Sequence, residues 1–352
     1  AGIQLKLSTG DHGATAAAIA QQIALQATAQ TDPDSFAASG PSLSQLSDLE
    51  LLDVAPRTAV FARVSQEQKL RLVEALQANG HVVAMTGDGV NDAPALKQAD
   101  IGVAMGVGGT EVAKEAADMV LTDDNFSTIE AAVEEGRAVF DNLVKFITWT
   151  LPTNIGEGLV ILVAVFAGLE LPITPVQILW INMTTAVLLG LMLAFEGKDP
   201  GSMKRPPRRP QTPVITLQLA VRVGVVSLML LIGSFGLFEW TLLHDRSLET
   251  ARTVAVNMFV FGELFYLFNC RSLRYSMFRL GVFSNRWLVL GVAAMVLLQI
   301  LFTYFPAMNH LFGSAPMTRT EWLWVLSGGL AIYAVVGIEK WFRCCADRGK
   351  GS

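Results

Sequence analysis

Charged residues are scarce in this chain of 352 residues, and cysteine is scarcer still. Only 16% of the residues are Asp, Glu, Lys or Arg, whereas soluble domains carry about 25%. The chain is 52% hydrophobic with a mean hydropathy of +0.44, which excludes a disordered chain and disfavours a purely soluble protein. The three cysteines, Cys270, Cys344 and Cys345, are too few for a disulfide scaffold.

The few charges are unevenly divided along the chain. Residues 1–145 have a net charge of −11, whereas residues 146–352 have a net charge of +6. The acidic front part argues against nucleic acid as a partner. The hydrophobic and mildly basic rear part indicates a lipid bilayer. Because the chain begins Ala1-Gly2-Ile3 without a methionine, we expect it to be a piece of a longer protein.

Residues 1–145 have the pattern of an α/β domain with a Rossmann-like parallel sheet and crossover helices, because short apolar runs alternate with amphipathic stretches. The expected strands are 3–7, 59–62, 82–85, 101–104 and 119–121. The expected helices are 12–25, 66–77, 93–98, 111–115 and 127–146. Residues 26–57 are rich in Ser, Asp, Ala and Pro, and predict a loose connection with a short helix near residues 44–52.

Residues 146–352 predict an all-α bundle of six transmembrane helices. A bilayer core of about 30 Å is crossed by about 20 helical residues. The six apolar segments cover approximately residues 147–169, 174–195, 217–243, 253–270, 286–305 and 321–342. Buried core helices of a large soluble domain are a poor alternative, since the six segments contain almost no internal charge.

Basic residues flank these segments on one side. They are Lys198, Lys204, Arg205, Arg208, Arg209, Arg271, Arg274, Arg279, Arg286, Lys340, Arg343, Arg348 and Lys350, against Arg246, Arg252 and Arg319 on the other side. The positive-inside rule therefore predicts that the α/β domain and the C-terminus are cytoplasmic. We expect a multi-pass protein of the plasma membrane.

The densest motif is Thr86-Gly87-Asp88-Gly89-Val90-Asn91-Asp92, between an apolar strand and a helix. Asp88 and Asp92 are four residues apart on this turn, so both carboxylates can reach one cation. Mg²⁺ needs only one or two carboxylates, because it keeps several waters and accepts phosphate oxygens. A calcium-binding EF-hand is excluded, since Val90 and Ala99 would stand at ligand positions. The alternative is an Asp-Gly turn without chemistry.

Two further segments follow expected strands. Lys69 stands at the head of helix 66–77, where its ammonium could neutralise a phosphoryl oxygen. By itself it is more simply explained as a surface lysine. Thr9, Gly10 and Asp11 follow strand 3–7, and by themselves they are typical of a helix N-cap.

Several polar side chains lie within the apolar segments. Glu157 and Glu263 are carboxylates inside expected spans, which are costly there and are functional candidates by default. Asn154 is three residues before Glu157 and Asn182 three before Thr185, so each pair shares a helical face. Pro152 frees a backbone carbonyl, and interrupted helices offer oxygens to ions. The alternative is hydrogen bonding between packed helices.

Together these residues resemble the phosphorylation domain of the P-type cation-transporting ATPases, which has a haloacid-dehalogenase-like fold. The matching segments are Thr-Gly-Asp-His at 9–12, Phe-Ala-Arg-Val at 61–64 with Lys69, Met-Thr-Gly-Asp-Gly-Val-Asn-Asp-Ala-Pro-Ala-Leu-Lys at 85–97, and Asp-Asn-Phe-Ser-Thr-Ile at 124–129. The run at 85–97 is highly specific. The rear part resembles the last six membrane helices of the calcium-pump-like branch.

The resemblance implies roles for individual residues. Asp88 would bind Mg²⁺, Asn91 and Asp92 would support the phosphoryl site, and Lys69 would bind the phosphoryl group. Thr9, Gly10 and Asp11 would flank the same pocket, and Arg63 would lie near the nucleotide, ATP. The ligands of the transported cation would be Asn154, Glu157, Asn182, Thr185 and Glu263. The intact pump would hydrolyse Mg-ATP through an aspartyl phosphate and export a cation, with Ca²⁺ as the first expectation.

The sequence also departs from the family. It contains no Asp-Lys-Thr-Gly-Thr run, which carries the phosphorylated Asp, and no nucleotide-binding or actuator domain. Enzymatic activity therefore requires the N-terminal part of such a pump, in cis or in trans. Ala186 stands where that branch usually has an Asp, so a pump for Na⁺, H⁺ or another cation stays open. A non-catalytic regulatory or assembly subunit is the alternative from another class.

Overall fold

The structure, a computed structural model, describes residues 2–23, 25, 36–273 and 275–349. The chain folds into two compact units. The first contains residues 1–133 and 203–210, and the second contains residues 134–202 and 211–352. A domain boundary near residue 145 stays a prediction.

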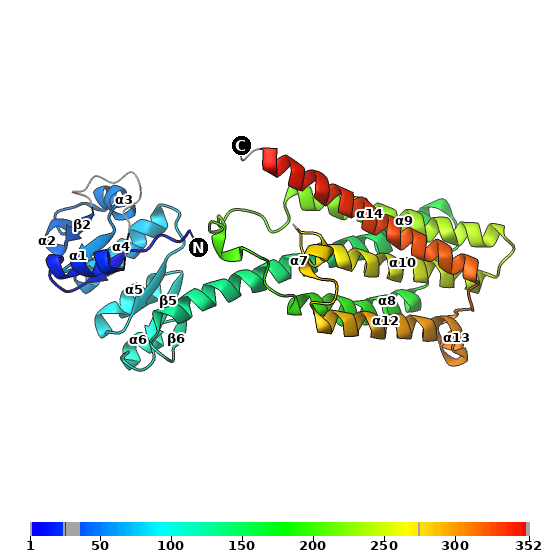
Figure 1. Cartoon of the computed structure of the whole chain (residues 1–352), viewed down its shortest axis with the longest axis horizontal. Helices are drawn as coiled ribbons and strands as arrows, with labels where there is room; N and C mark the ends of the chain where they lie inside the picture. Colours follow the sequence, from blue (N-terminus) through cyan, green and yellow to red (C-terminus); the bar gives the residue numbers. More distant parts are fainter. Residues whose placement is uncertain (1, 24, 26–35, 274, 350–352) are drawn as a thin grey trace. The chain divides into compact units, whose positions relative to one another are not determined.

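The described strands of the first unit form two three-stranded parallel sheets (Figure 1). The first sheet has the order β1 (Leu7–Thr9), β3 (Val60–Ala62), β2 (Ala37–Ser39). The second has the order β4 (Ala84–Gly87), β5 (Ile101–Met105), β6 (Met119–Leu121). The predicted α/β class is confirmed, because all strand pairs among the described residues are parallel and helices connect the strands.

Helices follow most of these strands. They are α1 (Gly13–Gln22), α2 (Gly40–Leu43), α3 (Asp48–Arg57), α4 (Gln66–Ala78), the 3₁₀ turn η2 (Val90–Asp92), α5 (Ala93–Gln98) and α6 (Glu111–Ala116). Local chemistry sets where they begin: Ser47 and Ser65 each form a capping box with the residue three positions on. Phe61 and Leu72 lie in the apolar core between α3, α4 and the first sheet.

Three predictions for this unit were wrong in detail. The first strand begins at Leu7, not at residue 3, because Leu7 pairs with Val60. The strand expected at 82–85 is β4, and it begins at Ala84, since its pairing with β5 starts there and Val82 is exposed. Within the connection 26–57, residues 26–35 lie outside the described residues. Residues 36–57 contain β2, which is a strand of the first sheet, and α2 and α3, which pack on that sheet.

Within its described residues, the second unit contains six helices long and apolar enough to span a membrane. They are α7 (Phe126–Ala167), α8 (Pro175–Thr185) with its continuations η3 (Ala186–Gly190, a π-helix) and η4 (Leu191–Phe195), α9 (Leu217–Leu243), α10 (Leu248–Cys270), α12 (Arg286–Tyr304) and α14 (Arg319–Gly349). The short elements η5 (Ser202–Lys204), α11 (Met277–Leu280) and α13 (Pro306–Phe312) lie between them. The predicted six-helix organisation is confirmed.

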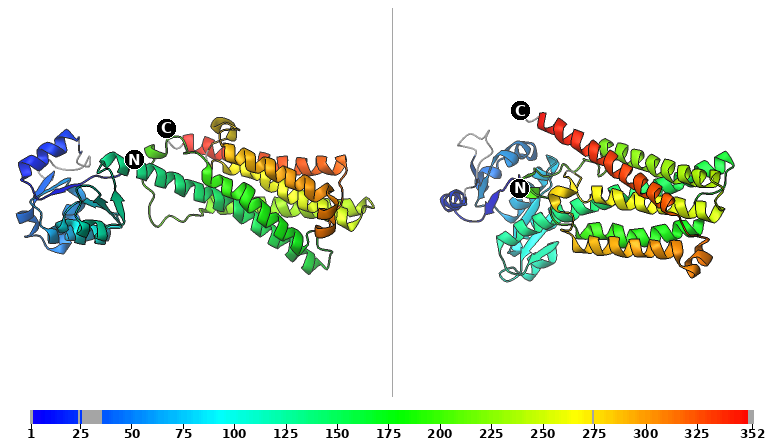
Figure 2. Two further views of the ribbon diagram at one scale, coloured as in Figure 1. Left: turned by 90° about the horizontal axis from the view of Figure 1, so that it is seen from below. Right: turned by 45° about the vertical axis from the view of Figure 1, so that its right-hand side comes forward.

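Helix α10 is the central helix of the second unit. Its most apolar 18-residue window is 89% buried inside the protein, against 28–39% for the other five spans. Figure 2 shows α9 and α14 beside α10, and α8 beside α12. The largest apolar core of the described residues therefore surrounds α10, with Phe259 and Leu267 fully buried in it.

Helix α7 joins the two units. The sequence predicts a helix ending at residue 146 and an interrupted span after it, but α7 runs without a break through Pro152. Proline has no N–H, so the carbonyl four residues earlier, that of Thr148, loses its helical partner. The Tyr266 hydroxyl of α10 donates to this carbonyl at 3.0 Å. Ser227 of α9 donates to the carbonyl of Pro152 itself at 3.0 Å.

We predict that Tyr266→Phe lowers the thermal unfolding midpoint of the detergent-solubilised protein. The substitution keeps the ring but leaves the Thr148 carbonyl buried without a donor, which costs about 1–3 kcal/mol. Tyr333→Phe on α14 is the matched control, since no hydrogen bond of the Tyr333 hydroxyl is recorded among the described residues. Equal midpoints for both variants would refute this account of α7.

Candidate functional site

The sequence motif at 86–92 forms the end of β4 and the turn that follows it. Lys69, in the first turn of α4, places its Nζ 2.6 Å from Oδ1 of Asp92. The other oxygen of Asp92 accepts the backbone N–H of Gly89 at 3.2 Å. A Cβ at Gly87 would stand 2.5 Å from the Cβ of Asp92, so only glycine permits this approach. The structure thus brings Lys69 and Asp92 together in a largely buried pair.

Asp88 and Asn91 lie on the exposed side of the same turn. The backbone carbonyl of Asp88 accepts the N–H of Thr110 at 2.8 Å, which ties the turn to the start of α6. Among the described residues, no hydrogen bond to the Asp88 carboxylate is recorded. Its oxygens are therefore available at the carboxyl end of β4, where parallel sheets usually bind ligands.

The turn Thr9–Asp11 stands at the carboxyl end of β1. The Thr9 hydroxyl donates to Asp11 at 3.3 Å and accepts the Asp11 N–H at 3.1 Å. Arg63, at the end of β3, donates its backbone N–H to the Asp11 carbonyl at 3.0 Å and has a left-handed φ of 54°. Thr9, Gly10, Asp11 and Arg63 therefore form one group, and no recorded hydrogen bond among the described residues joins them to Lys69 or Asp92.

Asp124 fixes a loop whose role the sequence did not reveal. Its carboxylate accepts the backbone N–H groups of Gly106 at 2.7 Å, Val107 at 3.0 Å and Gly108 at 2.6 Å. The N–H groups of Val107 and Gly108 are the main reason that the pKa of Asp124 lies below its ordinary value. The carboxylate holds the loop between β5 and α6, which also carries Thr110. The sequence motif at 124–129 includes Asp124, but the sequence does not show which backbone N–H groups its carboxylate accepts.

Three membrane helices bring polar side chains together in the second unit. Glu157 of α7 accepts the amide of Asn182 of α8 at 2.7 Å through Oε2. Glu263 of α10 is 1% exposed, lies close enough to Glu157 for their charges to interact, and has the Thr185 side chain against it. Oε1 of Glu157 and Oε2 of Glu263 are buried, and neither has a hydrogen-bond partner among the described residues.

Asn154 is not part of this cluster in the structure. It is exposed on α7 although Glu157, three residues on, is 6% exposed, so the two side chains differ in their surroundings. Ala186 is also exposed, at the start of the π-helix η3 that follows Thr185. Short π-helical segments frequently mark functional sites. The structure therefore brings together Glu157, Asn182, Thr185 and Glu263 and leaves Asn154 apart.

The donor sets can be compared with what metal ions require. No group of three His, Cys, Asp or Glu side chains able to hold a metal occurs within the described ranges. Asp88 fits Mg²⁺ as a single hard-oxygen ligand, since Mg²⁺ commonly takes its remaining ligands from water and phosphate. A Ca²⁺ ion needs six to eight oxygens, more than Glu157, Glu263, Asn182 and Thr185 supply by their side chains.

A buried ionic network closes one end of the helix bundle, and the sequence did not predict it. Arg271 is fully buried and forms a two-point bond with Glu196, at 2.8 and 3.1 Å. Lys145 of α7 contacts Asp199 at 3.2 Å. Asn142 donates to the Glu196 carbonyl at 2.9 Å. These bonds tie α7, the segment after η4 and the end of α10 into one structure.

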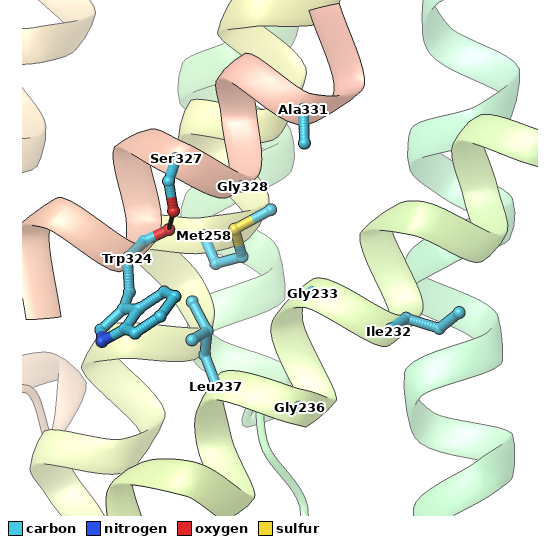
Figure 3. A pocket seen from close by; sticks show the side chains of 9 residues that line it. All are labelled: Ile232, Gly233, Gly236, Leu237, Met258, Trp324, Ser327, Gly328 and Ala331. Carbon is cyan, nitrogen blue, oxygen red and sulfur yellow. Dashed lines mark hydrogen bonds between the residues drawn. The ribbon is translucent and has the colours of Figure 1, made fainter. Parts of the chain in front are cut away.

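A groove of about 320 Å³ between α9, α10 and α14 is a different kind of feature (Figure 3). Its lining residues are Ile232, Gly233, Gly236, Leu237, Met258, Trp324, Ser327, Gly328 and Ala331. None of these is titratable, and the Ser327 hydroxyl already donates to the Trp324 carbonyl at 2.8 Å. The groove therefore lacks the groups that phosphoryl or cation chemistry needs.

We predict that Asp124→Asn speeds amide hydrogen exchange at Gly106, Val107 and Gly108 by about tenfold or more, because these N–H groups lose a charged acceptor. Asp123→Asn is the matched control, since Asp123 bonds to Asn125 and Thr128 instead. Because the pKa of Asp124 is lowered in the folded protein, its contribution is complete at neutral pH. It is lost as the pH falls below about 3.9. Unchanged exchange in Asp124→Asn would contradict the assignment.

The matches to known protein families fall separately in the two units. A family model described as cation transporting ATPase, C-terminus, matches residues 170–342. Two models of haloacid dehalogenase-like hydrolases match residues 1–100 and 68–133. The predicted haloacid-dehalogenase-like fold is thereby confirmed for the first unit.

Similar proteins cover nearly the whole chain. The probable cation-transporting ATPase F of Mycobacterium tuberculosis is 58% identical over 339 residues, 96% of this chain and 37% of that protein. The calcium-transporting ATPase of Bacillus subtilis is 43% identical over 329 residues, 93% of this chain and 36% of that protein. Calcium-transporting ATPase 1 of Schizosaccharomyces pombe is 38% identical over 345 residues, which are 97% of this chain and 38% of that protein. This chain thus spans little more than a third of these relatives. It is a membrane protein that belongs to the P-type cation-transporting ATPases and matches their C-terminal region.

Proposed function

We propose that this chain is the C-terminal part of an ATP-driven pump that exports a cation, with Ca²⁺ as the leading candidate. The observation that carries the proposal is the pair of buried carboxylates, Glu157 and Glu263, each with one oxygen without a partner among the described residues. Leaving such oxygens unpaired inside a membrane helix bundle is costly. A bound cation would satisfy both, and two carboxylates balance one divalent charge.

The ligand set proposed for the cation is Glu157, Asn182, Thr185 and Glu263, with Asn154 as a more distant candidate. Since Ca²⁺ needs more oxygens than these provide, backbone carbonyls or a further helix would supply the rest. The exposed methyl of Ala186 offers no oxygen. This residue supports the alternative of an ion that needs fewer ligands, such as Na⁺ or H⁺.

The proposed phosphoryl site is at the carboxyl ends of β1 and β4. Lys69 would neutralise a phosphoryl oxygen, and Asp92 would hold the ammonium in place through its 2.6 Å contact. Asp88 would bind the Mg²⁺ that accompanies ATP, with Asn91 beside it. Thr9, Gly10 and Asp11 would flank the phosphoryl group, and Arg63 would lie near the nucleotide. The bound Mg²⁺ would supply positive charge against the phosphate oxygens.

The aspartyl nucleophile would come from another segment. The sequence contains no Asp-Lys-Thr-Gly-Thr run. Strands β1 and β4 each have one strand neighbour among the described residues, so each has an edge that an additional strand could pair with. The greater length of the relatives supports the same view. A non-catalytic regulatory or assembly subunit is the competing function, and it requires no phosphorylation.

The proposed location is the plasma membrane, with the first unit and the C-terminus in the cytoplasm. The support is the excess of Lys and Arg in the segment between α8 and α9 and in the last turns of α14.

We predict that Glu157→Gln weakens binding of radioactive Ca²⁺ to the purified chain by about tenfold or more, the equivalent of about 1.4 kcal/mol or more. Glu239→Gln on α9 is the matched control, because Glu239 lies in a span but outside the cluster. Equal Ca²⁺ affinity in the wild type and Glu157→Gln would remove Glu157 from the site. Na⁺ competition against Ca²⁺ tests the alternative ion.

We predict that Asp88→Asn abolishes Mg²⁺-dependent phosphorylation from ATP when the chain is joined to the N-terminal region of a longer relative. The carboxylate is exposed, so the variant should fold, which the thermal midpoint would verify. Asp100→Asn is the control, since its carboxylate bonds to Val83 and Gln77 away from the motif. No phosphorylation in the joined wild-type protein would favour the non-catalytic subunit.

A further inference from the structure

Helix α12 approaches η3, the π-helical turn of the second span, at Gly291. A Cβ at this position would clash with the backbone carbonyl oxygen of Leu188, and it would stand 2.9 Å from Cγ of Met192. Gly291 is buried, as are Leu288 and Met295 on the same face of α12. Because a backbone carbonyl cannot turn aside as a flexible side chain can, only glycine permits this contact.

A second glycine, within η3 itself, lies against α7. A Cβ at Gly190 would stand 2.6 Å from Cζ3 of Trp149 and 2.9 Å from Cε2 of Phe146. The Trp149 indole is held in place, because it donates to the backbone carbonyl of Glu263 at 3.1 Å. The π-helix is therefore in close contact with two neighbouring helices, α12 and α7.

The residues that follow η3 are held firmly at the inner end of the span. The carbonyl of Met192 accepts the amide of Asn285 at 3.2 Å. Glu196 forms a buried two-point bond with Arg271, at 2.8 and 3.1 Å. Since bonds between charged groups are about twice as strong as neutral ones, this end of the span resists movement.

The winding of η3 sets how the outer part of the same span is turned. In η3 the N–H of Leu191 bonds to the carbonyl of Ala186, five residues earlier rather than four. Rewinding this turn as an α-helix would shift the register by one residue, about 100° of rotation and about 1.5 Å of translation. Outside the polar cluster, the recorded bonds from α8 side chains to other described elements are neutral. The outer part, which carries Asn182 and Thr185, would therefore move while the inner end stays.

We propose that Gly291 is a positioning residue for the cation site. It lets α12 hold η3 as a π-helix, and this winding directs Asn182 and Thr185 toward the two buried carboxylates. Helix α12 supplies none of the proposed ligands, so it acts through the backbone of η3 alone. The inference rests on the proposed function, because it concerns the site proposed for the transported cation.

The test compares the binding of radioactive Ca²⁺ by the purified full chain and its variants. Gly291→Ala should weaken binding by about tenfold or more, because the added methyl displaces the Leu188 carbonyl and η3 with it. Gly337→Ala on α14 is the matched control, since a Cβ there has no heavy atom of the described residues within 4 Å. It should bind Ca²⁺ as the wild type does. The thermal unfolding midpoint verifies that each variant is folded at the assay temperature.

A double variant separates positioning from a general loss of packing. Thr185→Val keeps the shape of the side chain but removes its hydroxyl. Gly291→Ala should weaken binding less in Thr185→Val than in the wild type, because the contact that it disturbs is already absent there.

Asn285→Ser is a second variant for the case in which Gly291→Ala does not fold. It removes the amide that donates to Met192 and keeps a side chain able to cap α12. Loosening this inner contact should weaken Ca²⁺ binding by about threefold.

Four results would overturn the inference. Equal Ca²⁺ affinity in Gly291→Ala and the wild type would remove Gly291 from the site and leave the proposed function intact. The same loss with and without Thr185→Val would show a packing defect instead of positioning. If Gly291→Ala does not fold, unchanged affinity in Asn285→Ser would exclude control through η3. No saturable Ca²⁺ binding by the wild type would refute the proposed Ca²⁺ site, and this inference with it.

Discussion

A polar group inside an apolar helix bundle must find its partner within the protein, and this constraint organises the second unit. The carbonyl freed by Pro152 receives the Tyr266 hydroxyl, and the Trp149 indole donates to the Glu263 carbonyl. Both contacts join α7 to α10, the most buried helix. Buried polar atoms without a hydrogen-bond partner among the described residues also occur at Thr150, Asn257 and Gln299, but Glu157 and Glu263 are the carboxylates in this group. The paired groups hold the helices together, and the unpaired carboxylate oxygens are the reason for proposing a cation at Glu157 and Glu263.

Burial also distinguishes charged groups that stabilise the fold from charged groups that could bind a ligand. Arg271 and Glu196 are buried and oppose each other at two points, with Asn285 also bonded to Glu196. Removing one partner of such a pair typically costs several kcal/mol, about 3–5, because the other charge stays buried. In the first unit, Lys69 and Asp92 form a comparable pair, whereas the Asp88 carboxylate is exposed. A phosphoryl group would therefore meet an oriented lysine and an available carboxylate.

The sequence predicted features that depend on local chemistry. Helix 217–243 was correct at both ends, because Thr216 caps its start and the apolar run ends at Leu243. The expected strands 59–62, 101–104 and 119–121 agree with the structure within one residue, whereas 3–7 and 82–85 were displaced by two to four residues, since pairing with β3 and β5 sets the register of β1 and β4 and pairing is not local. Arg271 and Glu196 are far apart in the sequence, and Asp124 acts on a preceding loop, so no spacing rule reveals either contact. The burial of Glu157 and the exposure of Asn154 likewise depend on which face of α7 the other helices cover.

The uninterrupted course of α7 has a mechanical consequence. Glu157 lies five residues after Pro152 on the same helix, about 7–8 Å along its axis at about 1.5 Å per residue. A helix that lacks one internal hydrogen bond bends most easily where that bond is lost, and in α7 this is the turn from Thr148 to Pro152. Helix α7 therefore bends most easily about one turn before Glu157 rather than evenly along its length. Flexing at this turn would change the direction of the Glu157 carboxylate relative to the part of α7 that precedes Thr148.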